Sequence, residues 1–103
     1  MTADQSIDVA STMKALGDPL RWRIVELLAA EELCVCHLVD ELDVGQPLVS
    51  HHLRALREAG LVESEKWRYW TYYRLHAERI APVATAVEAL SRSTASRDRR
   101  PCC

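Results

Sequence analysis

The feature that most constrains the fold is an abrupt change of pattern at Gly60. Before it, apolar residues recur at helical spacing, and after it the chain becomes rich in aromatic and β-branched residues. Breaks between the helical segments come from Gly17-Asp18-Pro19 and Asp43-Val44-Gly45. The pattern predicts helices over 7–16, 19–30, 35–42, 46–59 and 77–90, and strands over 61–64 and 69–75 around a tip at 65–68.

This order of elements predicts a winged helix-turn-helix, a mainly α fold with a small β-hairpin. The 103 residues suit one domain, which we expect to span 1–91. The remaining residues, 92–103, are rich in Ser and Arg and predict a flexible tail that ends in two cysteines. A domain of this size has a modest core, so a dimer interface would add to its stability.

The composition is that of an ordinary globular protein, with 49% hydrophobic and 27% charged residues. No apolar run approaches the roughly 18 residues of a membrane span. The opening residues Met1-Thr2-Ala3-Asp4 also lack the basic and then apolar pattern of a secretory signal. We therefore expect a cytoplasmic protein without membrane contact.

The charge distribution is more informative than the net charge of −2. Residues 1–45 carry nine acids and three bases, whereas 46–74 and 75–103 each carry five bases and three acids. A polyanion would therefore meet the middle and the end of the chain, with the acidic first part facing away.

The predicted helix 46–59 has two contrasting faces. At about 100° per residue, Val49, Leu53 and Leu56 fall together and are expected in the core. The opposite face is short, polar and basic, which suits the major groove of DNA. The predicted DNA contacts on this helix are Gln46, Pro47, Ser50, His51 and Arg54, with His52 expected on the core side.

The predicted hairpin would be the wing. Lys66 and Arg68 at its tip could contact phosphate or the minor groove, although the neighbouring Glu63 and Glu65 would repel the DNA backbone. Trp67 is open to two interpretations, a wedge in DNA or a packing residue. An alternative for the whole surface is an ordinary solvated face, or a winged helix that binds protein.

Four cysteines occur as two close pairs, Cys34/Cys36 and Cys102/Cys103. In a cytosolic protein such pairs favour metal or redox chemistry over a structural disulfide. If both residues of the first pair were helical, their side chains would point about 200° apart. We therefore expect that one ion could bind both sulfurs only by unwinding the start of the third helix, which would disturb the DNA-reading helix.

Three stretches resemble the ArsR/SmtB family of metal-responsive winged-helix repressors. They are Lys14-Ala15-Leu16-Gly17-Asp18-Pro19-Leu20-Arg21, then Glu32-Leu33-Cys34-Val35-Cys36-His37-Leu38, and finally Gln46-Pro47-Leu48-Val49-Ser50-His51-His52-Leu53 with Gly60-Leu61-Val62 and Tyr72-Tyr73-Arg74-Leu75. The resemblance covers about residues 8–90. It implies a homodimer joined through the first and last helices, bound to double-stranded operator DNA and released from it by metal.

The sequence departs from the family at ligand positions. Val39 stands where arsenic repressors of one type carry a third cysteine, and no cysteine precedes Cys34. The last helix offers only His76, Glu78 and Glu88, so a zinc site there is not expected. Beyond Cys34 and Cys36, the only further thiols are Cys102 and Cys103, from the same chain or its partner, and we predict these four as the metal ligands. His37 directly follows the first pair and could lend an imidazole to the ion, but we expect it to be a surface histidine.

As(III) and Sb(III) prefer three thiolates, whereas Cd(II) and Pb(II) accept three or four. The favoured prediction is therefore a repressor induced by As(III) or Sb(III), with Cd(II) or Pb(II) as the alternative. A repressor that senses oxidants through a disulfide to a tail cysteine also stays open. Two simpler interpretations also stay open. In one, Cys34 and Cys36 are buried structural residues, and in the other, the tail cysteines are only an exposed end of the chain. An enzyme is not expected, because no nucleophile–base group or phosphate-binding glycine loop is present.

Overall fold

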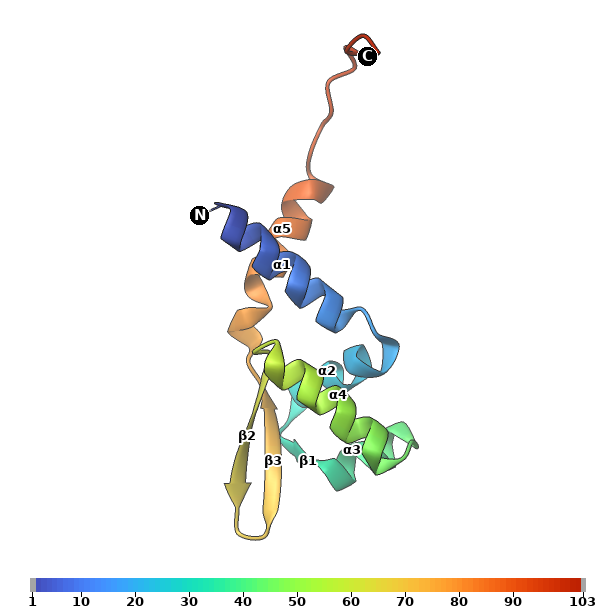
Figure 1. Cartoon of the computed structure of the whole chain (residues 1–103), viewed down its shortest axis with the longest axis vertical. Coiled ribbons are helices and arrows are strands. Elements are labelled where there is room, and N and C mark those ends of the chain that lie inside the picture. Colours follow the sequence, from blue (N-terminus) through green and yellow to red (C-terminus); the bar gives the residue numbers. More distant parts are fainter. Residues whose placement is uncertain (1, 103) are drawn as a thin grey trace.

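In the computed structural model the backbone is described for residues 2–102 and the side chains for residues 8–102. Five α-helices, one 3-10 helix and three short strands follow one another along this part of the chain (Figure 1). In chain order they are α1 (Thr2–Leu16), α2 (Pro19–Ala30), β1 (Leu33–Cys34), α3 (Val35–Leu42), α4 (Gln46–Glu58), β2 (Val62–Trp67), β3 (Trp70–Leu75), η1 (Ala77–Arg79) and α5 (Ala81–Ser91). The predicted winged helix-turn-helix is confirmed.

The first helix α1 begins at Thr2, earlier than the predicted start at residue 7, whereas local chemistry fixes the ends of the next helices close to where the sequence predicts them. Asp18 caps α2, because its carboxylate accepts the N–H of Leu20 at 2.8 Å and of Arg21 at 3.2 Å, and Pro19 suits the first turn. The α3 helix ends at Asp43 in the left-handed conformation (φ 55°). Gly60 adopts φ 78° after α4, a conformation that glycine enters without strain.

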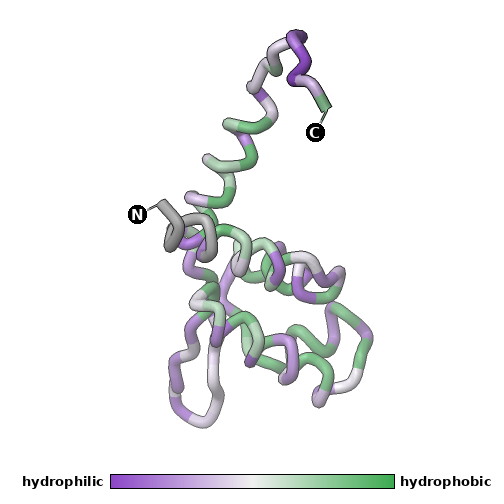
Figure 2. The backbone as a smooth tube through the Cα atoms, turned by 45° about the horizontal axis from the view of Figure 1, so that its top comes forward, coloured by the Kyte–Doolittle hydropathy of each residue, from purple (hydrophilic) through white to green (hydrophobic). Residues whose placement is uncertain are grey.

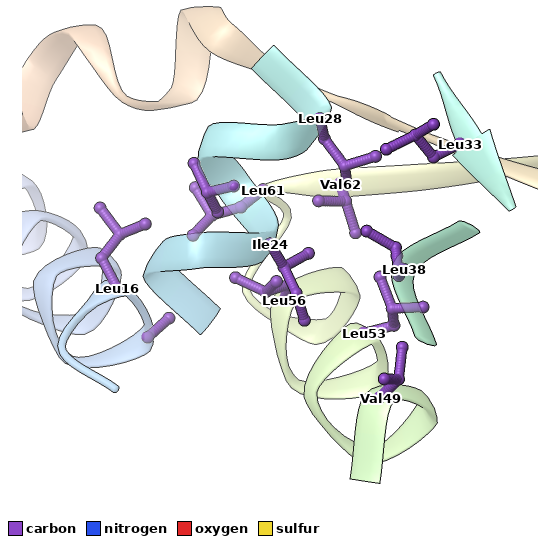
Figure 3. Close-up of a cluster of buried hydrophobic side chains, with 12 residues drawn as sticks. Leu16, Ile24, Leu28, Leu33, Leu38, Val49, Leu53, Leu56, Leu61 and Val62 are labelled. Atoms are coloured by element: carbon purple, nitrogen blue, oxygen red, sulfur yellow. The ribbon is translucent and has the colours of Figure 1, made fainter. Parts of the chain in front are cut away.

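One hydrophobic core lies between α2, α3, α4 and the start of the sheet (Figure 3). Most residues of this core lie on the apolar faces that the helical periodicity defines. Leu33, Leu61 and Val62 join them from β1 and the start of the wing. The largest side chains that are fully buried are Ile24, Leu38, Val49, Leu53, Leu56 and Leu61. Because Leu38 of α3 lies beside Leu53 of α4 in this core, the position of α4 depends on that of α3.

The sheet differs from the predicted hairpin in two respects. It has three antiparallel strands in the order β1-β3-β2, with Leu33 opposite Tyr73 and Cys34 opposite Tyr72. A strand of two residues is too short to show the alternation that sequence reading relies on. The wing is also longer than predicted, since β2 continues to Trp67 and the tip is reduced to Arg68 and Tyr69.

The prediction of one continuous last helix over 77–90 was wrong. A 3-10 turn at Ala77–Arg79 comes first, and α5 then begins at Ala81 with Pro82 in its first turn. Proline has no N–H to donate to a preceding turn, so it favours a fresh helix start at this position. The α5 helix and the tail project away from the core, which gives the molecule extents of 63 × 27 × 23 Å (Figure 1).

Apolar residues recur along α5 (Figure 2), and most residues of this helix are exposed. Val87 and Leu90 are exposed on α5, as is Met13 on the neighbouring helix α1. A groove of about 1050 Å³ runs between α1 and the segment formed by η1 and α5. Exposed apolar side chains gathered on two adjacent helices are typical of a protein interface.

A group of charges ties the wing to the segment before β1. The Arg74 guanidinium is paired with Glu63, lies 3.4 Å from Glu65, and lies 3.6 Å from Glu32. His76 extends the group, with ring nitrogens 3.0 Å from Glu63 and 2.8 Å from Glu78. Hydrogen bonds to Glu78 and then to Glu63 raise the pKa of His76 above its ordinary value of 6.5.

Replacing Leu56 with Ala should lower the free energy of unfolding by about 2–5 kcal/mol, because it leaves a cavity in the core. Urea unfolding at fixed protein concentration measures this. Leu48→Ala on the exposed side of the same helix is the control and should cost far less. Equal losses for the two variants would contradict the assigned core.

The stabilisation that His76 contributes should depend on pH. Because the folded state holds its proton more tightly than the unfolded state, the contribution is complete below the ordinary pKa of 6.5 and is lost as the pH rises through the raised pKa. The difference in unfolding free energy between the natural protein and His76→Gln should therefore be largest near pH 6 and shrink over the interval above pH 6.5 in which the raised pKa lies. A difference that stays constant or grows over this interval would show that the imidazole is not charged in the folded state.

Candidate functional site

Cys34 and Cys36 lie at the junction of β1 and α3. Cys34 ends β1 with extended backbone (φ −94°, ψ 171°) and is the N-cap of α3, while Cys36 is the second residue of that helix. Their sulfur atoms are 2.7 Å apart. The expectation that this pair could meet only after the helix unwinds was wrong, because Cys34 lies outside the helix and its extended backbone turns both thiols to the same side.

His37 belongs to the same group. Its Nδ1 accepts the backbone N–H of Cys34 at 3.1 Å and lies 3.3 Å from the Cys34 sulfur. Cys34 and His37 thus form a capping box, in which the third helical residue reaches back to the N-cap. The ligand atoms of Cys34, Cys36 and His37 all lie within 4.8 Å of one another, so these three residues could hold a metal ion. The spacing of three between Cys34 and His37, typical of a capping box, was the signal that sequence analysis missed.

The two thiols differ in acidity. Burial opposes ionisation of Cys34, but hydrogen bonds from the Cys36 thiol and from backbone N–H groups at the helix start outweigh it and lower its pKa. The pKa of Cys36 is raised, first by its hydrogen bond to Cys34 and then by burial. Of the two thiols, the buried Cys34 is therefore the first to ionise, and the exposed Cys36 holds its proton to higher pH.

Cys102 is not part of this group. Cys102 is exposed near the end of the extended tail, which leaves the domain on the side away from β1 and α3 (Figure 1). Cys103 lies outside the described residues. A role for Cys102 and Cys103 as metal ligands therefore stays a prediction.

The predicted DNA-reading residues occupy one exposed surface. Gln46, Pro47, Ser50, His51 and Arg54 are all exposed along α4, on the side opposite the core. His52 is only 6% exposed, as its predicted core position requires, and its Nε2 lies 3.8 Å from Asp18. Burial lowers the pKa of His52, which favours the neutral ring inside the domain.

The wing presents aromatic as well as basic side chains. Lys66 is exposed within β2 and not at the tip, whereas Arg68 is at the tip with φ 59° and its guanidinium lies 4.8 Å from the centre of the Trp67 ring. Tyr69 beside it is 90% exposed. The ring of Trp67 is 6.4 Å from that of Tyr72, which is in turn 6.3 Å from the ring of His37. Aromatic contacts thus extend from the cysteine pair to the wing tip.

The fold and the exposed polar face of α4 define the class of the protein, a winged-helix transcription regulator that binds DNA. The family model described as "Bacterial regulatory protein, arsR family" matches residues 18–64. The chain belongs to this family, whose members are transcription regulators and not enzymes. No helix in the described part of the chain is both long and apolar enough to cross a membrane.

Three similar proteins illustrate the range of the family. An uncharacterized HTH-type transcriptional regulator of Methanocaldococcus jannaschii is 40% identical over 82 residues, which cover 79% of this chain and 92% of the relative. The arsenic resistance transcriptional regulator ArsR1 of Pseudomonas putida is 48% identical over 66 residues, 63% of this chain and 52% of the relative, so this chain matches about half of its length. Among solved structures, the homodimeric winged helix-turn-helix domain Mb0332 of Mycobacterium bovis is 30% identical with a TM-score of 0.71, over 86% of this chain and 82% of that one. Further relatives are named as arsenical, cadmium or SmtB-type regulators.

Replacing Arg54 with Ala should weaken binding to the protein's own promoter DNA by roughly 1–3 kcal/mol, or 5- to 150-fold, because Arg54 projects from the exposed face of α4. Fluorescence anisotropy at several salt concentrations measures the loss. Arg23→Ala on α2 removes the same charge from a residue that pairs with Glu26 and is the matched control. Similar losses for both variants would place the DNA on a different face.

Proposed function

We propose that this protein is a homodimeric transcriptional repressor that leaves its operator when Cys34 and Cys36 take up As(III) or Sb(III). The observation that carries the proposal is the pair of sulfur atoms 2.7 Å apart at the start of α3. Thiolates are the ligands that thiophilic ions prefer, and two of them from one segment are already positioned for such an ion. A metal-responsive repressor of the ArsR/SmtB type is the broader description that this proposal refines.

The chemical state of the pair supports ion capture. Cys36 is exposed and offers the point of entry, whereas Cys34 is buried and has the lower pKa, so it supplies the thiolate. Uptake of an ion by both sulfurs releases the protons that they carry. The alternative interpretation, in which both cysteines are buried structural residues, fits less well because Cys36 is exposed and is not part of the core.

The position of the pair explains how ion binding and DNA binding could oppose each other. Cys34 starts α3, which packs against α4 through Leu38, and it also pairs with Tyr72 in the wing strand β3. A change in backbone or side-chain position at Cys34 therefore reaches both DNA-binding elements. If the ion and the operator favour different arrangements of this junction, each lowers the affinity of the protein for the other.

The number of thiolates decides between the two classes of inducer. Cys34 and Cys36 supply two, and we propose that Cys102 and Cys103, from this chain or from its partner, are available to complete the set. Three thiolates suit As(III) and Sb(III), whereas four suit Cd(II) or Pb(II), which is the alternative. Among the described residues, the segment from His76 to the end of α5 offers little competition for the ion, since Glu88 pairs with Arg92 at 2.5 Å and His76 pairs with Glu63 and Glu78.

The proposed dimer joins two copies through α1 and α5. The apolar residues exposed on these helices and the groove between them support this arrangement. The homodimeric structural neighbour from Mycobacterium bovis has the same fold. Two copies would present two α4 helices to successive major grooves of one DNA duplex.

Replacing Cys34 with Ser should abolish release from promoter DNA by arsenite while leaving DNA affinity without arsenite unchanged within about twofold, because the hydroxyl is a poor ligand for thiophilic ions. Anisotropy of the reduced protein on labelled promoter DNA measures both quantities. The double variant Cys102→Ser with Cys103→Ser tests the tail, and the proposal expects its release to require more arsenite.

Two results would contradict this account. One is normal release of the Cys34→Ser variant by arsenite, antimonite, Cd(II) and Pb(II). The other is release of the natural protein by a hydroperoxide alone, with no response to these ions, which would indicate the redox-sensing alternative.

A further inference from the structure

The tip of the wing exposes three aromatic side chains side by side. Tyr69 is almost fully exposed, and Trp67 and Trp70 are half-exposed. We propose that the ring of Tyr69 inserts between two base pairs in the minor groove of the operator and thereby bends the DNA. This inference rests on the DNA-binding part of the proposed function, and it adds a contact by base stacking to the contacts by charge that Lys66 and Arg68 could make.

The aromatic rings at the tip are held in two edge-on pairs. The ring of Tyr69 lies 6.1 Å from that of Trp70 at 82°, and the ring of Trp67 lies 6.4 Å from that of Tyr72 at 73°. Trp67 and Trp70 are also opposite each other in the register of β2 and β3, so they share one face of the hairpin. Edge-on contacts of this kind favour a defined ring orientation. The tip therefore presents a preorganised aromatic surface with Tyr69 as its most exposed ring.

The charges of the wing favour a polyanion at its tip. Glu63 and Glu65 lie nearer the base, where the guanidinium of Arg74 pairs with both of them and offsets their repulsion of phosphate. Residues 66–75 contain no acid. Lys66 and Arg68 thus give the outer part of the wing a positive charge beside its aromatic rings, a combination that suits nucleic acid.

The position of the tip connects it to the DNA-reading surface. Only residues 59–61 separate α4 from β2, so the wing starts directly beside the end of that helix. The wing tip and the start of α4 both lie at the end of the molecule away from α5 and the tail (Figure 1). One duplex can therefore contact α4 and the tip together, while the proposed dimer surface on α1 and α5 leaves the tip free.

Arg68 supports the insertion of its neighbour. Its φ of 59° lies in the left-handed region that favours glycine, yet the residue carries a long charged side chain. The guanidinium lies 4.8 Å from the centre of the Trp67 ring, beside the exposed ring of Tyr69. It can thus bind a phosphate next to the opened base step.

The proposal also restricts the DNA sequence. Base stacking on an aromatic ring tolerates every base, whereas the cost of opening a step depends on the step. Pyrimidine–purine steps such as TA and CA are the easiest to unstack. We therefore expect such a step in the minor groove next to the bases that α4 reads, at a position without direct hydrogen-bond readout.

The sharpest variant is Tyr69→Ala in the full-length protein. We expect it to bind a duplex of the protein's own promoter DNA at least about fivefold more weakly, because one base loses its stacking partner. Energy transfer between dyes at the two ends of the duplex should show a smaller bend. Tyr69→Phe keeps the ring and is the matched control, with affinity within about twofold and an unchanged bend. Because Tyr69 is almost fully exposed, neither variant removes a core contact.

The salt dependence of binding separates stacking from charge. Arg68→Ala should reduce the slope of log affinity against log salt concentration by about 1, because it gives up one phosphate contact. Tyr69→Ala should leave this slope unchanged, since an uncharged ring releases no counterions.

The inference and the proposed function fail in different ways. If Tyr69→Ala binds and bends the promoter duplex as the natural protein does, or binds it more weakly with the same bend, insertion is overturned and DNA binding through α4 stands. If the natural protein does not bind promoter DNA, the DNA-binding part of the proposed function is itself overturned. Binding to vesicles of anionic phospholipid that Tyr69→Ala loses, with its DNA affinity intact, would assign the tip to a membrane surface and also overturn the inference.

Discussion

The extended backbone of Cys34 is the constraint on which the rest of the site depends. One residue with φ −94° and ψ 171° ends a strand, starts a helix and brings its thiol to that of Cys36. If Cys34 were helical, the two sulfurs would lie on opposite sides of α3 and β1 would have no partner position opposite Tyr72. The pairing of β1 with β3 and the cap from His37 hold this backbone in place. The same junction therefore supports the fold and positions the chemistry.

The location of this junction makes a repressor of this size suited to switching. The core that positions α4 is shared with α3 through Leu38, so the DNA-reading face is not independent of the thiol site. The wing is linked to the same place twice, by the β1–β3 pairing and by the ion pair between Glu32 and Arg74. A ligand that rearranges a few atoms at the start of α3 thus acts on both contacts with DNA without crossing the domain.

Most of the fold could be predicted from the sequence, because helical periodicity and helix ends at Asp18, Gly60 and Pro47 are local signals. The face of α4 followed from the same periodicity, and the positions of His51 and His52 agree with it. Three features were not predicted: the two-residue strand β1, the 3-10 turn before α5, and the capping box that holds His37 against Cys34. Each depends on tertiary pairing or on the conformation of one residue, and a periodic pattern carries neither. The error over Cys34 and Cys36 came from treating Cys34 as helical when the directions of the two side chains were compared, although the predicted helix began at Val35.

The central claim is that the thiol site and the operator compete through one junction, and reciprocity makes this directly measurable. The measurement is the affinity of the reduced protein for arsenite, determined once without DNA and once with the protein saturated with promoter DNA, under the same conditions. The account predicts weaker arsenite binding on DNA, by the same factor by which arsenite weakens DNA binding, commonly about 5- to 150-fold for such couplings. Equal arsenite affinity in the two states would contradict it, because a ligand that binds both states equally cannot shift the equilibrium between them.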